Sequence, residues 1–299
     1  MTGELVALFG GSGFLGSAIA PRLLAAGHSV RVVTRQLKNF TGARAGLEFM
    51  AADLRDGASI ARALEGATAA VNVVGLYRER RGLTFEEVHV AGARRLALRA
   101  RQAGLSDLIH MSGIGVDIAS KSTYLQARSE GEAVVREAFP DAVILRPSAI
   151  FGPDAGLVTS LAAMLRWAPV FQLFGDGSAW LQPVAVGDVA AATAGALADP
   201  KARGRILELG GQKVYSYREL LELLLRAMGK TCHLLPLSYG TWELLAGLLS
   251  PLPNPPVTLA QVSLMRHDNV VSAGAGTLED LGVQPTALED KLAEMIRSR

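Results

Sequence analysis

The chain has 299 residues, of which 49% are hydrophobic and 19% are charged, and its formal net charge is +2. This length and apolar content suffice for one large α/β domain, or for a domain with an appended lobe. The basic residues are scattered, and the tightest run, at 78–81, is typical of a solvated loop, so the charge pattern excludes a nucleic-acid footprint. The single cysteine, Cys232, excludes an internal disulfide framework, and the sequence offers no cluster of metal ligands.

No signal peptide is predicted, because a strand-like run starts almost at once and no basic region precedes a long apolar one. The most apolar late segment, at 239–256, holds about ten apolar residues before its prolines, whereas about twenty are needed to span a bilayer. We therefore expect a cytoplasmic protein without a transmembrane segment. Segment 239–256 leaves room for a peripheral position at the inner membrane.

In chain order, short apolar runs alternate with helical patterns. This alternation predicts right-handed βαβ units and a doubly wound Rossmann-like parallel sheet with helices on both faces. Beyond residue 151 the pattern loosens into a smaller C-terminal α/β lobe. We therefore expect a dinucleotide-binding core at 1–151 and a lobe for substrate or partner at 152–299, interleaved with the core. The strand-like runs lie at 5–10, 29–35, 47–53, 69–75, 107–113 and 142–152, and the helical patterns at 17–27, 59–66 and 93–104.

The first strand-like run leads into the stretch "GGSGFLG", in which Gly10, Gly13 and Gly16 are spaced by two residues. Glycines at such positions permit a tight turn and let backbone amides approach a pyrophosphate at a helix N-terminus. A strand before the motif and a helix after it make dinucleotide binding the preferred interpretation.

The residues at the end of the second strand indicate which nicotinamide dinucleotide, NAD or NADP, is preferred. Where an acidic residue would hydrogen-bond the adenosine ribose of NAD, this chain has Arg35, followed by Lys38. Arginine pairs with a 2′-phosphate, so we expect NADP(H) to be preferred, with NAD(H) as the alternative. Asp53, at the end of the third strand, is expected either to accept a hydrogen bond from the adenine amino group or to cap the next helix.

Taken together, these motifs resemble the extended and atypical short-chain dehydrogenase/reductases. "GGSGFLG", "AADLRD", "NVVG", "HMSGIG" and "ILRPSAIFGP" occur in the order and spacing of that superfamily. "HVAGARRLA", "YLQARSEGE", "LQPVAVGDVA" and "LELGGQKVYSYREL" are similar to the nucleotide-binding accessory subunits of respiratory complex I and their bacterial relatives. The resemblance implies a bound nicotinamide nucleotide and, for the mitochondrial relatives, a stabilising role near the quinone-binding region. It adds to the nucleotide site Phe14, Leu15, Leu54, Val74, Gly75, Tyr124, Arg128, Pro147, Ser148 and Ala149.

Active members of this superfamily use Tyr-x-x-x-Lys with a nearby serine, and the resemblance aligns Tyr124 with that tyrosine. Arg128 occupies the lysine position; arginine keeps the positive charge but cannot release a proton. Where the superfamily often has two adjacent hydroxyl residues, this chain has Ser112 and then Gly113, with Ser122 as another candidate. Tyr124, Arg128 and Ser112 are thus the catalytic candidates of a constellation with two departures.

Three further features allow two interpretations each. His89 is a lone histidine near the expected cleft, for which a structural role is preferred to a functional one. Asp188 is expected to cap the helix that begins with "GDVAAA" rather than to act in catalysis. The apolar residues at 242–249 have helical spacing and face either the core or a partner protein or membrane surface.

Three functions remain open. The first is an NADP(H)-binding protein with little or no catalytic activity and a structural or assembly role in a respiratory or quinone-related complex. The second is an NADP-dependent reductase, epimerase or dehydratase with Tyr124 as proton donor. The third is a redox sensor of the NADPH/NADP ratio that exchanges its nucleotide quickly.

Overall fold

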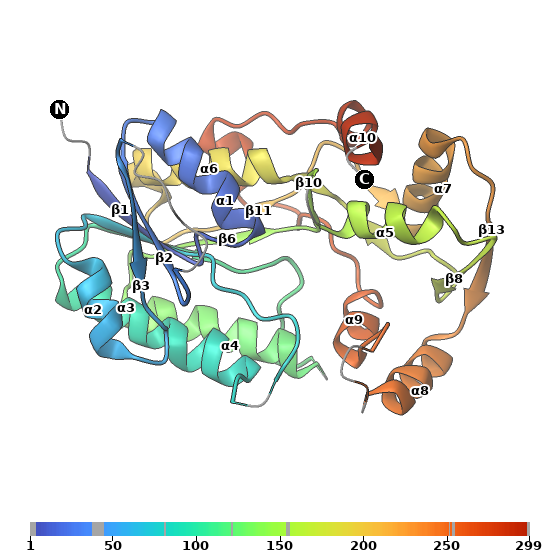
Figure 1. Ribbon diagram of the computed structural model, residues 1–299, viewed down its shortest axis with the longest axis horizontal. Coiled ribbons are helices and arrows are strands. Elements are labelled where there is room, and N and C mark those ends of the chain that lie inside the picture. The colour runs from blue at the N-terminus through green and yellow to red at the C-terminus, as the bar shows by residue number, and fades with distance from the viewer. Residues whose placement is uncertain are drawn as a thin grey trace.

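A computed structural model describes residues 4–37, 45–80, 82–120, 122–153, 156–250, 252 and 255–297. Its centre is a seven-stranded parallel sheet that lies between two layers of helices (Figure 1). The strands follow the order β11 (Ile206–Leu209), β6 (Val143–Pro147), β5 (Asp107–Met111), β4 (Ala69–Asn72), β1 (Leu5–Phe9), β2 (Ser29–Thr34) and β3 (Leu47–Ala51). The doubly wound fold predicted from the sequence is confirmed.

Both faces of the sheet are buried, which explains why its strands read as continuous apolar runs. Along β1, Val6 and Leu8 belong to the core on one face, and Ala7 and Phe9 to the core on the other. The first face carries α1 (Phe14–Ala25) and α6 (Val186–Ala198), which pack on each other. The opposite face carries α2 (Gly57–Leu64), α3 (Ala93–Gln102) and α4 (Thr123–Ala138), together with the π-helix η1 (Glu86–Gly92) (Figure 1).

The order of the strands reverses between β1 and β4. From β1 the chain continues to β2 and β3 on one side, and from β4 to β5 and β6 on the other. In open α/β sheets, ligands bind in the crevice at the carboxyl ends of the strands at such a switch point. The fold therefore places the glycine loop, which follows β1, at the expected ligand crevice.

The second half of the chain builds a smaller lobe beside the carboxyl ends of the sheet (Figure 1). This lobe has its own apolar core, in which Phe171, Leu173, Leu220 and Leu292 are buried together. Its helices are α5 (Leu157–Leu165), α7 (Tyr217–Met228), α8 (Tyr239–Leu249), α9 (Leu259–Leu264) and α10 (Leu288–Arg297), and its strands are β7 (Ile150–Phe151), β8 (Val170–Phe174), β9 (Trp180–Leu181), β10 (Val184–Ala185), β12 (Tyr215–Ser216) and β13 (His233–Leu237).

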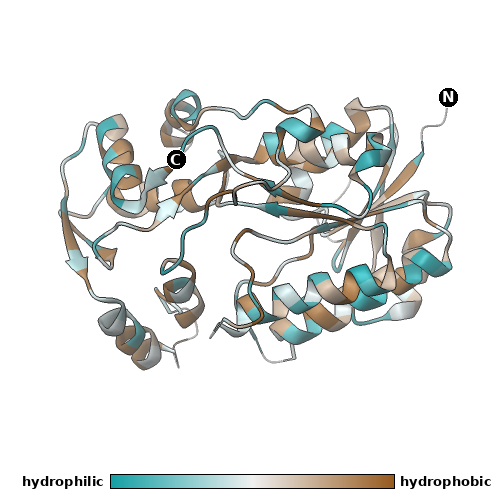
Figure 2. Ribbon diagram, turned by 180° about the vertical axis from the view of Figure 1, so that it is seen from behind, coloured by the Kyte–Doolittle hydropathy of each residue, from teal (hydrophilic) through white to brown (hydrophobic). Residues whose placement is uncertain are grey.

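The chain crosses between the two halves more than once. After β10 it returns to the sheet half as α6, and β11 then adds the seventh strand beside β6. Within the part of the chain described above, no helix is both long enough and apolar enough to cross a bilayer. Figure 2 shows that α8 and α9, in the lower part of the lobe in that view, carry many apolar residues.

Candidate functional site

A cavity of about 1800 Å³ lies between the carboxyl ends of the sheet and the C-terminal lobe. Its walls come from the glycine loop and the loops after β2 to β6 on one side, and from α5, α8 and α9 on the other. Sites for one small ligand usually have volumes of about 300–1,000 Å³. The cavity is thus larger than a single small ligand requires.

Two of the three motif glycines are needed by the protein itself. Gly10 has a φ of +81°, and a Cβ there would lie 3.0 Å from the backbone of Val73 and Val74. A Cβ on Gly16 would lie 2.4 Å from the carbonyl oxygen of Gly10. A side chain at Gly16 would therefore displace backbone, and one at Gly10 would be strained by the left-handed backbone conformation in addition to its tight contacts.

Gly13 is different, because the protein leaves room for a side chain there. Its φ is −83°, and the nearest atom to an added Cβ is the Gly10 carbonyl oxygen at 3.4 Å. Gly13 lines the cavity and is the N-cap of α1. Because glycine has no side chain, it makes no side-chain capping hydrogen bond. The missing side chain leaves the first-turn amides of α1 accessible from the cavity. An uncapped helix N-terminus of this kind suits the negative charge of a pyrophosphate, so the loop fits the dinucleotide predicted from its sequence.

Arg35 follows β2 directly, is exposed, and lines the same cavity. Among the described residues no carboxylate forms an ion pair with it. Its guanidinium is thus available for a ligand at the rim. Lys38, the second residue expected at this position, lies outside the described residues.

Asp53 lines the cavity but does not cap the following helix. The N-cap of α2 is Asp56, which accepts a hydrogen bond from the Ala58 amide, so the capping alternative for Asp53 is wrong. Arg55 instead holds Asp53, with Nη2 at 2.7 Å from Oδ2 and Nε at 3.0 Å from Oδ1. This pairing keeps the pKa of the Asp53 carboxyl below its usual value. Asp53 therefore faces the cavity as an ionised acceptor that is already shared with Arg55.

The remaining residues expected at the nucleotide site also line the cavity. They are Phe14, Leu15, Leu54, Val74, Gly75, Pro147, Ser148 and Ala149. The fold brings them together because each lies at or after the carboxyl end of a strand in the sheet, or in the first turn of α1.

Asn269 also lines this cavity, and sequence reasoning missed it. Its Oδ1 accepts hydrogen bonds from Ser148 Oγ at 2.6 Å and from the Ala149 amide at 2.9 Å. Its Nδ2 donates to the Ile114 carbonyl at 3.1 Å. Asn269 thus ties the loops after β5 and β6 to a segment of the C-terminal lobe. A lone asparagine in the stretch "RHDNVV" gives no sequence signal for this role.

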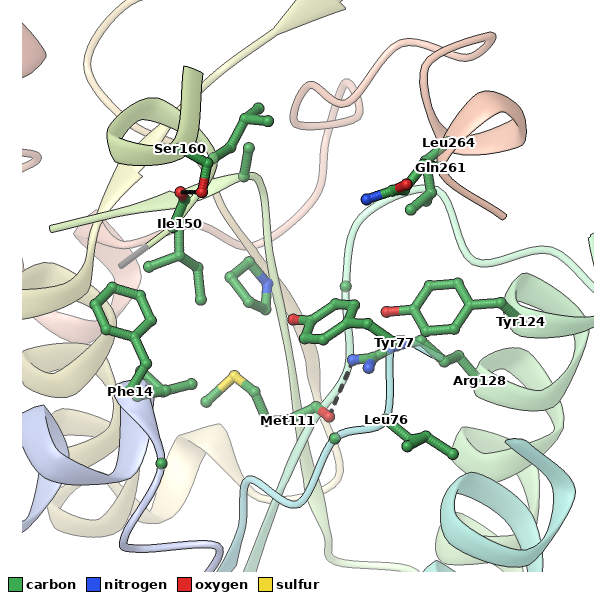
Figure 3. Close-up of a pocket in the computed structure, with 18 of the residues that line it drawn as sticks. Phe14, Leu76, Tyr77, Met111, Tyr124, Arg128, Ile150, Ser160, Gln261 and Leu264 are labelled. Carbon is green, nitrogen blue, oxygen red and sulfur yellow. Dashed lines mark hydrogen bonds between the residues drawn. The ribbon is translucent and has the colours of Figure 1, made fainter. Parts of the chain in front are cut away.

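Tyr124 lies on the first turn of α4 and is only 5% exposed. Three rings surround it: Phe85 and His89 contact it edge-on, with centroids at 5.3 and 5.7 Å, and Tyr77 lies at 5.9 Å. Its hydroxyl points into the cavity (Figure 3). Burial raises the pKa of Tyr124 to about 12, although the nearby charge of Arg128 opposes this shift.

Arg128 stands one turn further along α4, 9% exposed. Its Nη2 donates to the Met111 carbonyl at 3.2 Å (Figure 3), and its Nε has no hydrogen-bond partner among the described residues. No carboxylate of the described residues pairs with this guanidinium. A buried cation without a counter-ion is costly, so the wall at Arg128 favours an oxygen acceptor from a ligand.

Neither serine candidate is hydrogen-bonded to Tyr124 among the described residues, and of the two only Ser112 lines the cavity. The Oγ atoms of Ser112 and Ser122 are both buried, and neither has a hydrogen-bond partner in the described part of the chain. A Cβ on Gly113, in contrast, would lie 3.9 Å from an Arg128 guanidinium nitrogen, in ordinary contact. Position 113, where the superfamily resemblance expects the second hydroxyl, thus lies beside Arg128 and carries no hydroxyl.

His89 has a structural position behind Tyr124. It is 4% exposed, and its Nε2 lies 2.9 Å from the Leu76 carbonyl oxygen and 3.3 Å from the Leu76 amide. Burial lowers its pKa to about 4, and the charge of Arg128 adds to this effect. His89 therefore stays neutral near pH 7 and supports the cavity loop around Leu76. His110 is likewise buried, 3.1 Å from the Asn72 amide nitrogen, with a pKa lowered to about 3 by burial.

Asp188 has a structural role, but not the predicted one. The N-cap of α6 is Ala185, so Asp188 does not cap this helix. Its carboxylate accepts hydrogen bonds from the Thr286 amide at 2.7 Å and the Thr286 hydroxyl at 2.8 Å. It thereby fixes the segment that leads to α10.

Comparison with known proteins places these features in a family. Residues 6–210 match the NAD dependent epimerase/dehydratase family. NADH dehydrogenase (ubiquinone) 1 alpha subcomplex subunit 9, mitochondrial, of Mus musculus is 31% identical over 305 residues, covering 99% of this chain and 81% of that protein. The ceramide reductase of Caulobacter vibrioides is 32% identical over 175 residues, covering 58% of this chain and 55% of that protein.

A solved structure shows the same fold over the whole chain. The UDP-glucose 4-epimerase of Thermus thermophilus, in complex with NAD, superposes with a TM-score of 0.73 at 22% identity, covering 99% of this chain and 98% of the other. The match over 6–210 spans the glycine loop, Tyr124 and the strand ends that line the cavity. The chain therefore belongs to the NAD dependent epimerase/dehydratase family, the extended short-chain dehydrogenase/reductases.

Proposed function

We propose that this protein holds NADP(H) in the cavity and contributes little or no chemistry to it. Its role in this proposal is structural, as a nucleotide-bound component of a respiratory or quinone-related complex peripheral to the inner membrane. The proposal has three parts, which are the choice of nucleotide, the weak active site and the partner.

Arg35 supports the choice of NADP(H). It lies at the cavity rim directly after β2, and among the described residues it forms no close ion pair, although its charge acts on Asp53, which is already paired with Arg55. A guanidinium binds a 2′-phosphate through paired, charge-assisted hydrogen bonds. Its interaction with an uncharged ribose hydroxyl is much weaker. The nucleotide itself would supply hydride-transfer chemistry if a substrate were present.

The weak active site rests on one observation: the position beside Arg128 from which a hydroxyl would act is Gly113. Without that hydroxyl, Tyr124 lacks a partner for holding a substrate oxygen. A general acid works best when its pKa is near the operating pH, but burial raises the pKa of Tyr124 to about 12. Both features disfavour proton transfer by Tyr124.

The partner is suggested by the relatives. Proteins that match nearly the whole chain are named as subunits of NADH dehydrogenase. The exposed face of α8, where Leu244 and Leu248 are 63% and 69% exposed, supports contact with another apolar surface.

The alternative enzymatic function is favoured by a different observation. The cavity beside Tyr124 is open and continues into the C-terminal lobe, so a second molecule has room next to the nucleotide. A reductase, epimerase or dehydratase with Tyr124 as acid would use this space, and one relative is named as a ceramide reductase. A redox sensor would differ from the structural protein only in rapid nucleotide exchange.

The test begins with the purified full chain. Denaturation followed by chromatography identifies the released nucleotide, and its dissociation rate is measured by exchange with labelled NADPH. Single-turnover absorbance then follows NADPH oxidation with a panel of quinones and carbonyl compounds. Stoichiometric NADPH, slow release and no oxidation are expected. Turnover that Tyr124→Phe abolishes would establish the enzyme instead, and dissociation within seconds would favour the sensor.

A further inference from the structure

The half of the cavity that faces the C-terminal lobe differs in composition from the half at the glycine loop. The charged residues that line the cavity, such as Arg35, Asp53 and Arg128, all come from the sheet half. From Pro147 onward, no described residue of the lining is charged. The lobe side is formed mainly by apolar side chains, among them Leu161, Phe171, Leu237, Leu245, Leu249 and Met265.

This composition does not suit a ligand with phosphate groups. Pyrophosphates in proteins are bound by arginine or lysine side chains or by runs of backbone amides. An apolar wall without charges instead gains free energy from the hydrocarbon that it removes from water, about 25 cal/mol per Å². The lobe side of the cavity therefore selects against a nucleotide sugar and for an extended apolar molecule.

The volume leaves room for such a molecule beside a dinucleotide. One small ligand usually occupies about 300–1,000 Å³, and the whole cavity measures about 1800 Å³. Tyr124 stands where the two sides meet, because its hydroxyl points into the cavity between Arg128 and the lobe (Figure 3).

Two more polar groups reach this junction. The Tyr77 hydroxyl and the Gln261 amide also point into the cavity (Figure 3). Gln261 Oε1 accepts a hydrogen bond from the Thr258 amide at 2.9 Å as part of the cap of α9, which leaves its amide nitrogen to face the cavity. The junction thus offers hydrogen bonds to a small oxygen-bearing head group, while the buried Nε of Arg128 lacks an acceptor.

Helix α8 separates the apolar wall from the outside. Leu245 and Leu249 line the cavity, whereas Leu244 and Leu248 do not. Elsewhere on the lobe side, Met164 of α5 lines the cavity and is 55% exposed. Leu245 and Leu244 are therefore adjacent residues of one helix that differ in whether they contact the cavity.

We infer that the lobe side of the cavity binds a molecule with a long hydrocarbon chain, acyl or isoprenoid, whose small uncharged oxygen-bearing head group lies at Tyr124. This inference concerns binding only and does not depend on catalysis or on the identity of the nucleotide.

The experiment uses the full chain, with and without saturating NADPH. Tritiated hexadecanol and tritiated farnesol, each delivered from cyclodextrin, are titrated separately in equilibrium dialysis, and UDP-glucose is titrated by calorimetry. Leu245→Arg and Met164→Arg place a charge in the apolar wall at positions that are partly exposed, so these variants are expected to fold. Leu244→Arg is the matched control, and circular dichroism checks that each variant is folded.

At least one alcohol is expected to bind in a 1:1 ratio, and UDP-glucose is not. Leu245→Arg and Met164→Arg should weaken binding of that alcohol at least tenfold, and Leu244→Arg should change it less than twofold. The ratio of the affinities for hexadecanol and farnesol shows whether the cavity prefers an acyl-type or an isoprenoid chain. The inference is overturned if neither alcohol binds, if UDP-glucose binds and displaces them, or if all three variants have equal effects. Alcohol binding without NADPH binding would refute the proposed function but leave this inference intact.

Discussion

The guanidinium carbon of Arg128 lies 5.6 Å from the centre of the Tyr124 ring, and both side chains are buried on one face of α4. The pair keeps the positive charge beside a phenol that characterises the active superfamily, but in a form that cannot release a proton. The lysine and the hydroxyl that the superfamily pattern has at positions 128 and 113 can therefore be restored by substitution.

Arg128→Lys combined with Gly113→Ser should create proton-transfer activity. A Cβ at position 113 has ordinary contacts, 3.7 Å from the Pro147 carbonyl oxygen, so the serine fits without displacing backbone. We expect single-turnover NADPH oxidation, absent in wild type, to appear at about a hundredfold above the background rate with the best substrate of the panel. Arg128→Lys with Gly113→Ala is the control, because it adds the Cβ without the hydroxyl. Equal rates in the two double variants would show that the hydroxyl is not what the site lacks.

Arg35→Ala should reduce affinity for NADPH at least tenfold and leave affinity for NADH nearly unchanged. The reason is that only NADPH has the 2′-phosphate with which the guanidinium forms charge-assisted hydrogen bonds. Fluorescence titration of both nucleotides measures the difference. Arg22→Ala, an exposed position in the last turn of α1, serves as the control. A parallel loss for both nucleotides would contradict the assigned role.

Gly13→Ala and Gly16→Ala should fail in different ways. At Gly13 the added methyl group has room in the protein, so the free energy of unfolding should change by less than about 1 kcal/mol. Because the methyl group lies in the cavity, nucleotide affinity should fall at least tenfold. At Gly16 the methyl group would lie 2.4 Å from the Gly10 carbonyl oxygen, and the variant should be strongly destabilised. Urea denaturation and nucleotide titration separate the two effects, and a stable Gly16→Ala would be evidence against this packing.

Asn269→Ala should destabilise the protein by about 2–4 kcal/mol. It leaves the Ala149 amide and the Ile114 carbonyl without the partners they have at 2.9 and 3.1 Å. It should also weaken nucleotide binding, because Ser148 and Ala149 line the cavity. His267→Ala, two residues earlier and exposed, should do neither. Thermal denaturation with and without NADPH tests both effects.

Stability should fall as the pH drops from 6.5 toward 4. In the unfolded chain histidine takes up a proton near pH 6.5, but burial lowers the pKa of His89 to about 4 and that of His110 to about 3 in the folded protein. The unfolded state therefore binds more protons in this window, and each histidine reduces the free energy of unfolding by about 0.7 kcal/mol per pH unit at pH 6.5, a slope that rises toward about 1.4 kcal/mol per pH unit near pH 5.5. Urea denaturation at pH 6.5, 6 and 5.5 measures this slope. His89→Gln removes one of the two contributions. An unchanged slope in that variant would contradict the contribution assigned to His89.

Local pattern was sufficient to predict the sheet and the glycine loop. Apolar runs such as 5–10 and 69–75 are buried on both faces, and the role of Gly10 and Gly16 depends on neighbours close in sequence or in the next strand. The departures at Arg128 and Gly113 were also visible in the sequence, because the helix and the strand end fix their positions relative to Tyr124.

The contributions of the C-terminal lobe could not be predicted in the same way. Asn269 contacts Ser148 and Ala149 across more than a hundred positions of the chain, and no short motif records such a contact. The capping expectations for Asp53 and Asp188 were wrong for a related reason. Each side chain has a partner that a helix-start pattern does not reveal, Arg55 in one case and Thr286, far along the chain, in the other.

The core on the α1 and α6 face is completed by Leu278, Leu281 and Val283, near the end of the chain. A Cβ on Gly195 of α6 would lie 2.6 Å from the Leu281 carbonyl oxygen, so this late segment lies directly on the helix. During translation, a nascent polypeptide that already contains the glycine loop still lacks part of the packing beneath it. Domains commonly fold in the order in which the ribosome makes them, but here residues made late, 278–283, contribute to the core of the N-terminal half. Any truncation or C-terminal fusion that disturbs residues 278–283 would therefore damage a binding site formed mainly by the opposite end of the polypeptide.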